Sequence, residues 1–155
     1  MTIRTIHSTI KVVQLLAPVV GNNDTEGTPA TGLDTRDADS AELIALLGNS
    51  GDTLSDTVKV DLILEDSDNN TTFAAVTDAN SVIVASDGVA VLPDSNGIVA
   101  TIDAPAEDTR KIRVGYLGTK RYARLRFKFT GTHTNGIPIA EIGILGHVHA
   151  APTAD

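Results

Sequence analysis

The sequence of 155 residues contains no cysteine and no tryptophan, and only 3% of its residues are aromatic. Without cysteine the chain can form neither disulfides nor thiolate metal sites, and it has no thiol nucleophile. Two tyrosines and three phenylalanines are too few for the aromatic platforms on which sugars or nucleic-acid bases stack. We therefore expect a single domain whose core consists mainly of valine, isoleucine, leucine and alanine.

Long apolar runs are also missing. No stretch approaches the roughly 18 apolar residues of a membrane-spanning helix. Residues 1–7 lack the basic region and apolar run of a secretory signal, so we expect synthesis in the cytoplasm and no membrane partner. The sequence lacks the Gly-x-x-x-x-Gly-Lys-Ser/Thr, Gly-x-Gly-x-x-Gly, His-Glu-x-x-His and Gly-x-Ser-x-Gly motifs of common nucleotide-binding and hydrolytic sites. We expect no enzymatic activity and no cofactor.

Short apolar runs alternate with clusters of turn-forming residues about every ten residues, which is typical of an all-β fold. The clearest strand is Tyr122–Phe129, in which apolar and basic side chains alternate. Val58–Glu65 has the same period, but Ile63 interrupts its polar face, so we expect another element or subunit to cover part of that face. Further strands are predicted at Lys11–Leu16, Ser40–Leu47, Val82–Ala85, Ile98–Ile102, Lys111–Leu117 and Ile137–Leu145.

These strands predict one domain over residues 1–155, an antiparallel β-sandwich or jelly-roll-like barrel with extended terminal arms at residues 1–10 and 147–155. Ser40–Leu47 also has good helix propensity, although a strand is favoured in this context. Residues 21–39 are expected to form a long polar loop. The dipeptide Ala17-Pro18 marks a bend where a central strand could not continue.

Three groups of residues could carry chemistry, and each has a simpler explanation. His147 and His149 could bind zinc with a third ligand such as His133 or Glu141, but they are better explained as exposed histidines. Asp66–Asn70 begins like a calcium loop, but it lacks the later glycine and glutamate and fits an ordinary turn. We expect Glu141 to lie on the solvent side of a strand. No metal site and no catalytic residue is predicted.

Charge is unevenly distributed along the chain. The formal net charge is −8; residues 1–109 hold 18 acidic and four basic side chains, whereas residues 110–128 hold eight basic and no acidic ones. The segment predicts either a surface for a charged partner or a basic strand face that neighbouring carboxylates neutralise. An isoelectric point near 4.8 argues against nucleic acid as the partner. The candidate partner-binding residues are Arg110, Lys111, Arg113, Tyr116, Lys120, Arg121, Tyr122, Arg124, Arg126 and Lys128, and the strands flanking Leu117–Lys120 are expected to form a hairpin.

Within this segment, Val114-Gly115-Tyr116-Leu117-Gly118-Thr119-Lys120-Arg121-Tyr122-Ala123-Arg124 resembles a segment of small virion proteins of tailed bacteriophages, whose genes tend to lie beside the major capsid gene. The resemblance extends to Lys11–Gln14, to the Asp66–Phe73 turn and to a closing Gly-His-x-x-His-Ala-like tail. Here that tail, Gly146–Ala150, is one residue shorter between its histidines. Thr28–Asp56 has no counterpart in the resemblance.

The resemblance implies a structural virion protein of the head decoration, or cement, family, which binds the outer surface of the phage capsid and stabilises it. Its partner would be the major capsid protein, and its location the capsid surface after synthesis in the host cytoplasm. A homo-oligomer is expected, with a trimer favoured. The alternatives are a tail or neck component and a carbohydrate-binding β-sandwich used in host adhesion, which the shortage of aromatic residues disfavours.

Overall fold

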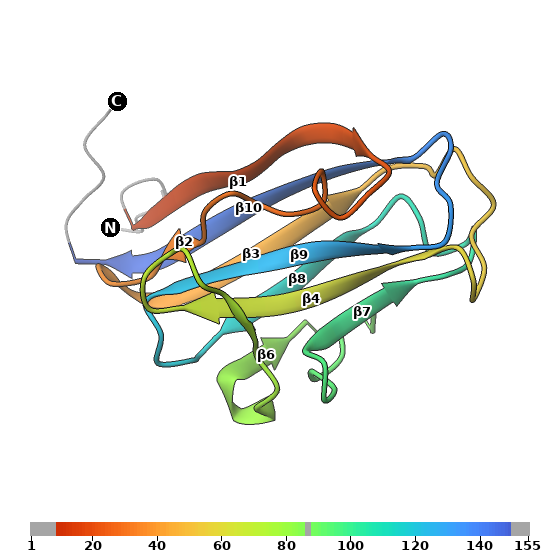
Figure 1. The fold of residues 1–155 in the computed structure, drawn as a ribbon. Helices are drawn as coiled ribbons and strands as arrows, with labels where there is room; N and C mark the ends of the chain where they lie inside the picture. Colours follow the sequence, from red (N-terminus) through yellow and green to blue (C-terminus); the bar gives the residue numbers. More distant parts are fainter. Residues whose placement is uncertain (1–8, 86–87, 150–155) are drawn as a thin grey trace.

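The computed structural model describes residues 9–85 and 88–149, and its regular structure consists of β-strands and one short 3-10 turn, Ala79–Ser81 (Figure 1). In chain order the strands are β1 (Ile10–Gly21), β2 (Leu33–Asp34), β3 (Ala38–Leu47), β4 (Lys59–Ser67), β5 (Ala74–Ala75), β6 (Val82–Val84), β7 (Ile98–Ile102), β8 (Lys111–Tyr116), β9 (Tyr122–Thr130) and β10 (Ile137–Val148).

The strand pairs are nested, as they would be if one long hairpin were rolled up. β1 pairs with β10, β2 with β9, β3 with β8 and β4 with β7, all antiparallel. Two further pairings, β10 with β3 and β9 with β4, join these strands into two sheets. Sheet A has the order β1-β10-β3-β8-β6, and sheet B has the order β2-β9-β4-β5 with β7 also paired to β4. This is the strand order of a double-sheet jelly roll.

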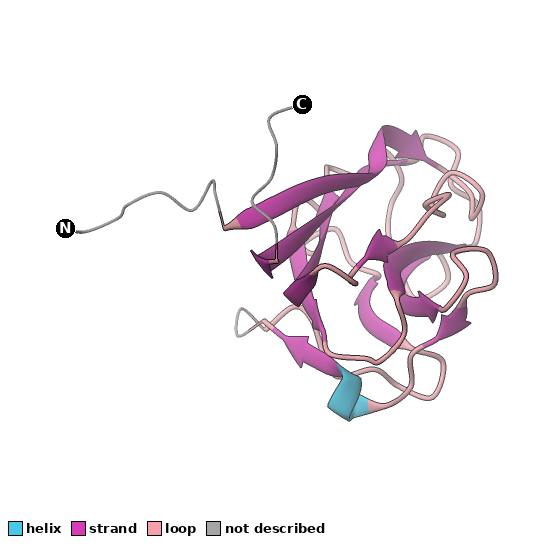
Figure 2. Cartoon of the chain, turned by 90° about the vertical axis from the view of Figure 1, so that its left-hand side faces the viewer, coloured by secondary structure: helices cyan, strands magenta, loops and turns pink. Residues whose placement is uncertain are grey.

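The two sheets form separate layers with the core between them (Figure 2). The fully buried side chains are mainly Leu, Ile, Val and Ala, and Phe127 is the largest of them. The predicted all-β sandwich and its aliphatic core are therefore confirmed. Period-two alternation in β9 is also confirmed, since Ala123, Leu125 and Phe127 are completely buried and the intervening basic residues face outward.

Strand β4 is covered on both faces. Every residue from Val60 to Ser67 is buried, including Asp61, Ile63 and Glu65 on the outer face. The segment before β2 and the turn after β4 supply part of this cover, because Arg124 of β9 donates to the Pro29 carbonyl and stacks on Phe73. The prediction that another element covers the face around Ile63 is confirmed.

Strand β1 lies at the edge of sheet A and contains Pro18. Proline has no N–H to donate to a neighbouring strand, and an edge strand tolerates this because one of its sides is unpaired. Its register against β10 shifts between Gln14 and Leu16 and again before Val19. Ser40–Leu47 lies within a strand, which confirms the favoured alternative. The predicted loop at residues 21–39 contains β2, so it is not a continuous loop. The predicted arms lie outside the described residues except at 9–10 and 147–149, where Ile10 and Val148 belong to strands.

Candidate functional site

The predicted basic segment does not form one surface, because its two strands belong to different sheets. β8 pairs with β3 and β6 in sheet A, whereas β9 pairs with β2 and β4 in sheet B. The expected hairpin around Leu117–Lys120 is therefore wrong: this connection carries the chain from one layer to the other. Lys111 and Arg113 lie on sheet A, and Arg124, Arg126 and Lys128 lie on sheet B.

On sheet B, carboxylates of the same chain neutralise most of this charge. Glu65 binds Arg124 at 2.8 Å through one carboxylate oxygen and Arg126 at 2.7 Å through the other. Arg126 also lies 3.8 Å from Asp24. The side chains of Glu65 and Arg124 are about one-tenth exposed, so this network is screened from solvent. It attaches the segment before β2 to the outer face of the sheet.

At the connection between the layers, three more predicted residues have partners within the chain. Arg121 binds Asp34 through both Nε and Nη2, and this contact holds the pKa of Asp34 below its ordinary value. Lys120 lies 2.8 Å from Asp66, which also accepts a hydrogen bond from the Tyr116 hydroxyl. Burial and the Asp66 carboxylate both raise the pKa of Tyr116. These contacts stabilise the connection.

The remaining predicted residues are Arg110, Lys111, Arg113, Tyr122 and Lys128. Arg110 donates to the Ala106 carbonyl, and Tyr122 lies beneath the Arg121 guanidinium at 4.7 Å. Within residues 9–85 and 88–149, Lys111 and Lys128 have no ion pair. Lys111 and Arg113 are exposed on the outer face of sheet A, so a partner could reach these two predicted residues there.

The outer face of sheet A is mostly apolar. One row of facing residues runs across all five strands: Val12, Ile144, Glu42, Gly115 and Ile83. The next row contains Gln14, Ile142, Ile44 and Arg113, and a third contains Ala140, Leu46 and Lys111. Both ends of the first row are open to solvent, because Val12 and Ile83 are each 56% exposed. We call these residues face A.

Face A differs from an ordinary solvated sheet face, where polar side chains alternate with buried apolar ones. β3 and β10 have apolar residues on both faces, as β4 does, but no described element covers their outer side. The charged residues near the middle of face A, Glu42 and Arg113, neutralise each other across a 2.6 Å contact. An apolar centre with few charges is typical of the central region of a protein–protein interface.

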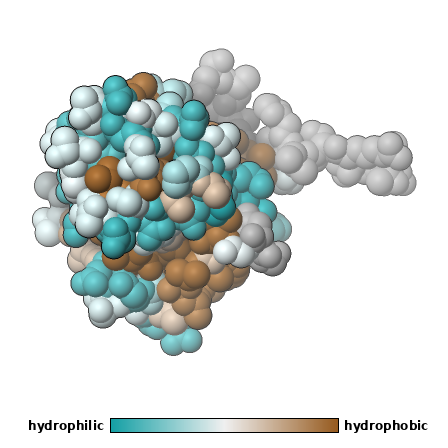
Figure 3. All heavy atoms as spheres, turned by 90° about the vertical axis from the view of Figure 1, so that its right-hand side faces the viewer, coloured by the Kyte–Doolittle hydropathy of each residue, from teal (hydrophilic) through white to brown (hydrophobic). Residues whose placement is uncertain are grey.

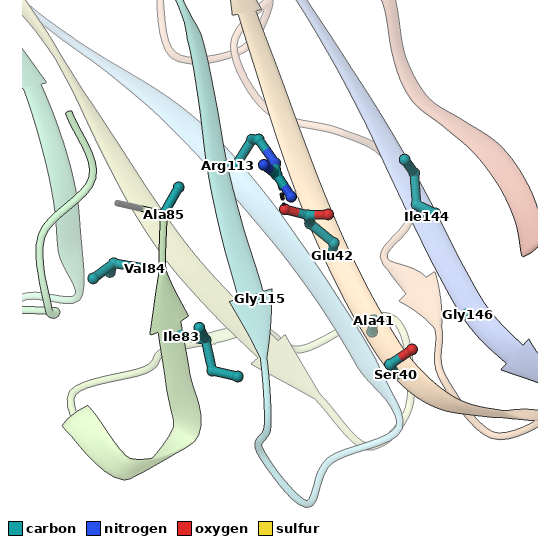
Figure 4. A pocket seen from close by; sticks show the side chains of 10 residues that line it. All are labelled: Ser40, Ala41, Glu42, Ile83, Val84, Ala85, Arg113, Gly115, Ile144 and Gly146. Carbon is teal, nitrogen blue, oxygen red and sulfur yellow. Dashed lines mark hydrogen bonds and ion pairs between the residues drawn. The ribbon is translucent and has the colours of Figure 1, made fainter. Parts of the chain in front are cut away.

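Face A also contains a shallow groove with a volume of about 440 Å³. Gly115 and Gly146 leave its floor without side chains, while Ile83 and Ile144 form its two sides. In Figure 4 the side chains of Glu42 and Arg113 point toward each other across the groove. The groove places two apolar walls and one neutralised ion pair within reach of a partner's side chains.

Glu141 lies in the core, so the prediction that it faces solvent is wrong. Its side chain is completely buried, and Oε1 accepts a hydrogen bond from the Leu125 N–H of the opposite sheet at 2.9 Å. Strand β2 pairs only with Tyr122 and Ala123 of β9, so Glu141 provides the acceptor for the Leu125 N–H beyond that pairing. The other oxygen, Oε2, has no hydrogen-bond partner. Burial raises the pKa of Glu141 from 4.5 to about 8.

The structure does not bring the histidines together. His149 binds Asp39 at 2.7 Å near one end of β10, whereas His133 lies before the other end and packs against Phe129. Among residues 9–85 and 88–149, no group of three or more His, Asp or Glu side chains is arranged to hold a metal ion. The Asp66–Asn70 segment forms a turn, in which the Asn69 side chain accepts the N–H groups of Thr71 and Thr72.

Apolar surface also occurs away from face A. Val91 and Leu92 are more than half exposed, and Figure 3 shows apolar side chains gathered in the lower half of one end of the molecule.

No helix within the described part of the chain is long and apolar enough to span a membrane. Comparison with family models, curated proteins and solved structures gives no match for this chain.

Proposed function

We propose that this chain is a structural virion protein that binds the outer surface of a phage capsid and stabilises it, with no enzymatic activity. The observation that supports binding to another protein is face A, an apolar sheet surface that no described element covers. The capsid as partner rests on the sequence resemblance. Jelly rolls occur in many functional classes, so the fold itself does not select a partner.

Each of the 12 residues of face A occupies about 30 Å² of the sheet, because outward residues alternate along strands about 4.8 Å apart, so face A presents roughly 400 Å². This is about half of the 800 Å² that each partner buries in a standard interface, so the contact would extend beyond face A. Binding only the assembled shell would stabilise that shell by mass action. The major capsid protein would contact Ile83 and Leu46, with Lys111 at the border of the contact.

Binding to purified expanded shells tests the proposal. Ile83→Lys and Leu46→Lys place a charge on face A at side chains already 56% and 41% exposed, so folding should tolerate both. We expect each to weaken shell binding at least tenfold in a co-sedimentation assay. Val91→Lys, at a side chain 53% exposed outside face A, is the matched control and should bind like the unmodified protein.

The unmodified protein should also raise the melting temperature of the shells, and virions should contain hundreds of copies by quantitative mass spectrometry. A few to dozens of copies would favour the tail or neck alternative, and none would refute a virion role. Equal shell binding by Ile83→Lys, Leu46→Lys and Val91→Lys would exclude face A as the binding surface.

A further inference from the structure

Strand β1 leaves one edge of sheet A open along a regular five-residue segment. Ile10–Gln14 pairs with Gly146–Ile142 without a register shift, and β10 is the only partner of β1 among the described residues. The edge strand on the opposite side of sheet A, β6, is three residues long. Short edges resist pairing with other chains, whereas long regular edges favour it.

The ladder fixes which backbone groups face outward. The His147 N–H donates to the Thr9 carbonyl, so residues 9, 11 and 13 direct their backbone groups toward β10. Alternation in an antiparallel ladder then directs the N–H and C=O groups of Ile10, Val12 and Gln14 away from the sheet. The side chain of Val12 lies on face A and is 56% exposed.

We propose that this segment pairs with the same segment of a second copy of the chain, antiparallel and centred on Val12. The segment is self-complementary in this register: Val12 faces Val12 of the second copy, and Ile10 faces Gln14. Lys11 faces Val13, so no two like charges lie directly opposite each other. Each outward pair exchanges two hydrogen bonds, for about six in total.

The second half of β1 explains why pairing would stop there. The two register shifts and the missing N–H of Pro18 interrupt the regular edge, and such features block edge-to-edge association. Pairing is thus confined to one segment and closes after two copies, because the contact is isologous. The result is a ten-stranded sheet that joins two copies of face A. This proposed two-fold dimer differs from the trimer favoured by the sequence, and the mass of the associated species distinguishes the two.

The interface is small, so we expect a concentration-dependent equilibrium between monomer and dimer. Sedimentation velocity of the free protein over a concentration series should show the 16.2 kDa chain converting to a species of twice that mass. Val12→Pro removes an outward N–H without affecting the β10 ladder and should shift the midpoint at least tenfold to higher concentration. Val12→Lys should have the same effect.

Val20→Lys is the matched control, because Val20 lies in the interrupted half of the same strand and is 54% exposed. It should dimerise like the unmodified protein. A monomer at every concentration, or a dimer unaffected by Val12→Pro, would overturn the proposal. Dimerisation that appears only after deletion of residues 1–8 would also overturn it, since the chain's own first residues would then occupy the edge. The measurement uses free protein, so failure of shell binding leaves its outcome unaffected.

Discussion

Replacing Glu141 by glutamine should change the pH dependence of folding more than any other single substitution at a described carboxylate. The neutral folded form retains the acceptor for the Leu125 N–H, and glutamine preserves that acceptor with nearly the same shape. What glutamine removes is ionisation. The unfolded chain ionises near the ordinary pKa of 4.5, whereas the folded chain ionises at about 8.

The direction in which the free energy of unfolding changes with pH follows from proton binding. Between these two values the folded state holds a proton that the unfolded state has released, so the free energy of unfolding falls as the pH rises. The contribution of Glu141 is complete below pH 4.5 and is lost as the pH rises to about 8. At about 1.4 kcal/mol per pH unit, the loss is about 3 kcal/mol at pH 7 and about 5 kcal/mol above pH 8. The total free energy of unfolding of a typical domain is only about 5–15 kcal/mol.

Urea denaturation at half-unit steps from pH 4 to pH 9 measures this effect. The other titrating groups are common to both proteins, so the difference between the two stability curves isolates residue 141. Glu141→Gln should be the more stable protein at pH 8, and the difference between the curves should shrink by several kcal/mol toward pH 4. The Oε2 position has no partner in either protein, which adds a constant offset only.

Glu141→Met separates ionisation from the hydrogen bond. It should share the pH dependence of the glutamine variant but be less stable by about 1–3 kcal/mol at every pH, because the Leu125 N–H loses its acceptor. Parallel curves for the unmodified protein and Glu141→Gln across the whole pH range would refute the reasoning.

Two further predictions concern stability, and both can be measured by urea denaturation at pH 7. Glu65→Ala leaves Arg124 without a carboxylate in a nearly buried network and leaves Arg126 only Asp24 at 3.8 Å, so it should cost about 3 kcal/mol. Glu42→Ala on the more exposed face A should cost at most about 1 kcal/mol. Similar costs for the two would contradict the difference in burial. Gly143→Ala places a Cβ 2.7 Å from the Leu33 side chain and should cost about 1–3 kcal/mol. Leu33→Val should recover part of that loss in the double variant, and additive costs would show that the two residues do not interact.

The predictability of each strand depended on whether one of its faces is polar. β9 could be predicted because its outward residues are basic and its inward residues are apolar. β10 could not be oriented, since Ile142 and Ile144 on one face match Ile139 and Leu145 on the other. Alternation therefore gave no indication that Glu141 points into the core.

The pairing of distant segments also escaped local reasoning. β8 and β9 are separated by only five residues, a spacing that usually joins paired strands. The nested arrangement instead pairs β8 with β3, about 70 residues earlier in the chain, and sends β9 to the other layer. The basic segment was therefore predicted as one surface, although the fold divides it between two.

The apolar residues on both faces of β10 also bear on the proposed function. The chain's own loops cover part of the outer side of sheet B, and the buried Glu65 neutralises Arg124 and Arg126 of β9. The outer side of sheet A is more apolar, and Gln14, Glu42, Lys111 and Arg113 are the polar residues in its rows. Face A has no cover among the described residues, and exposed apolar patches often mark interaction sites, which is the support for our proposal that a partner binds there. The variants on face A and at Val12 address the two surfaces that such a partner and a second copy would occupy.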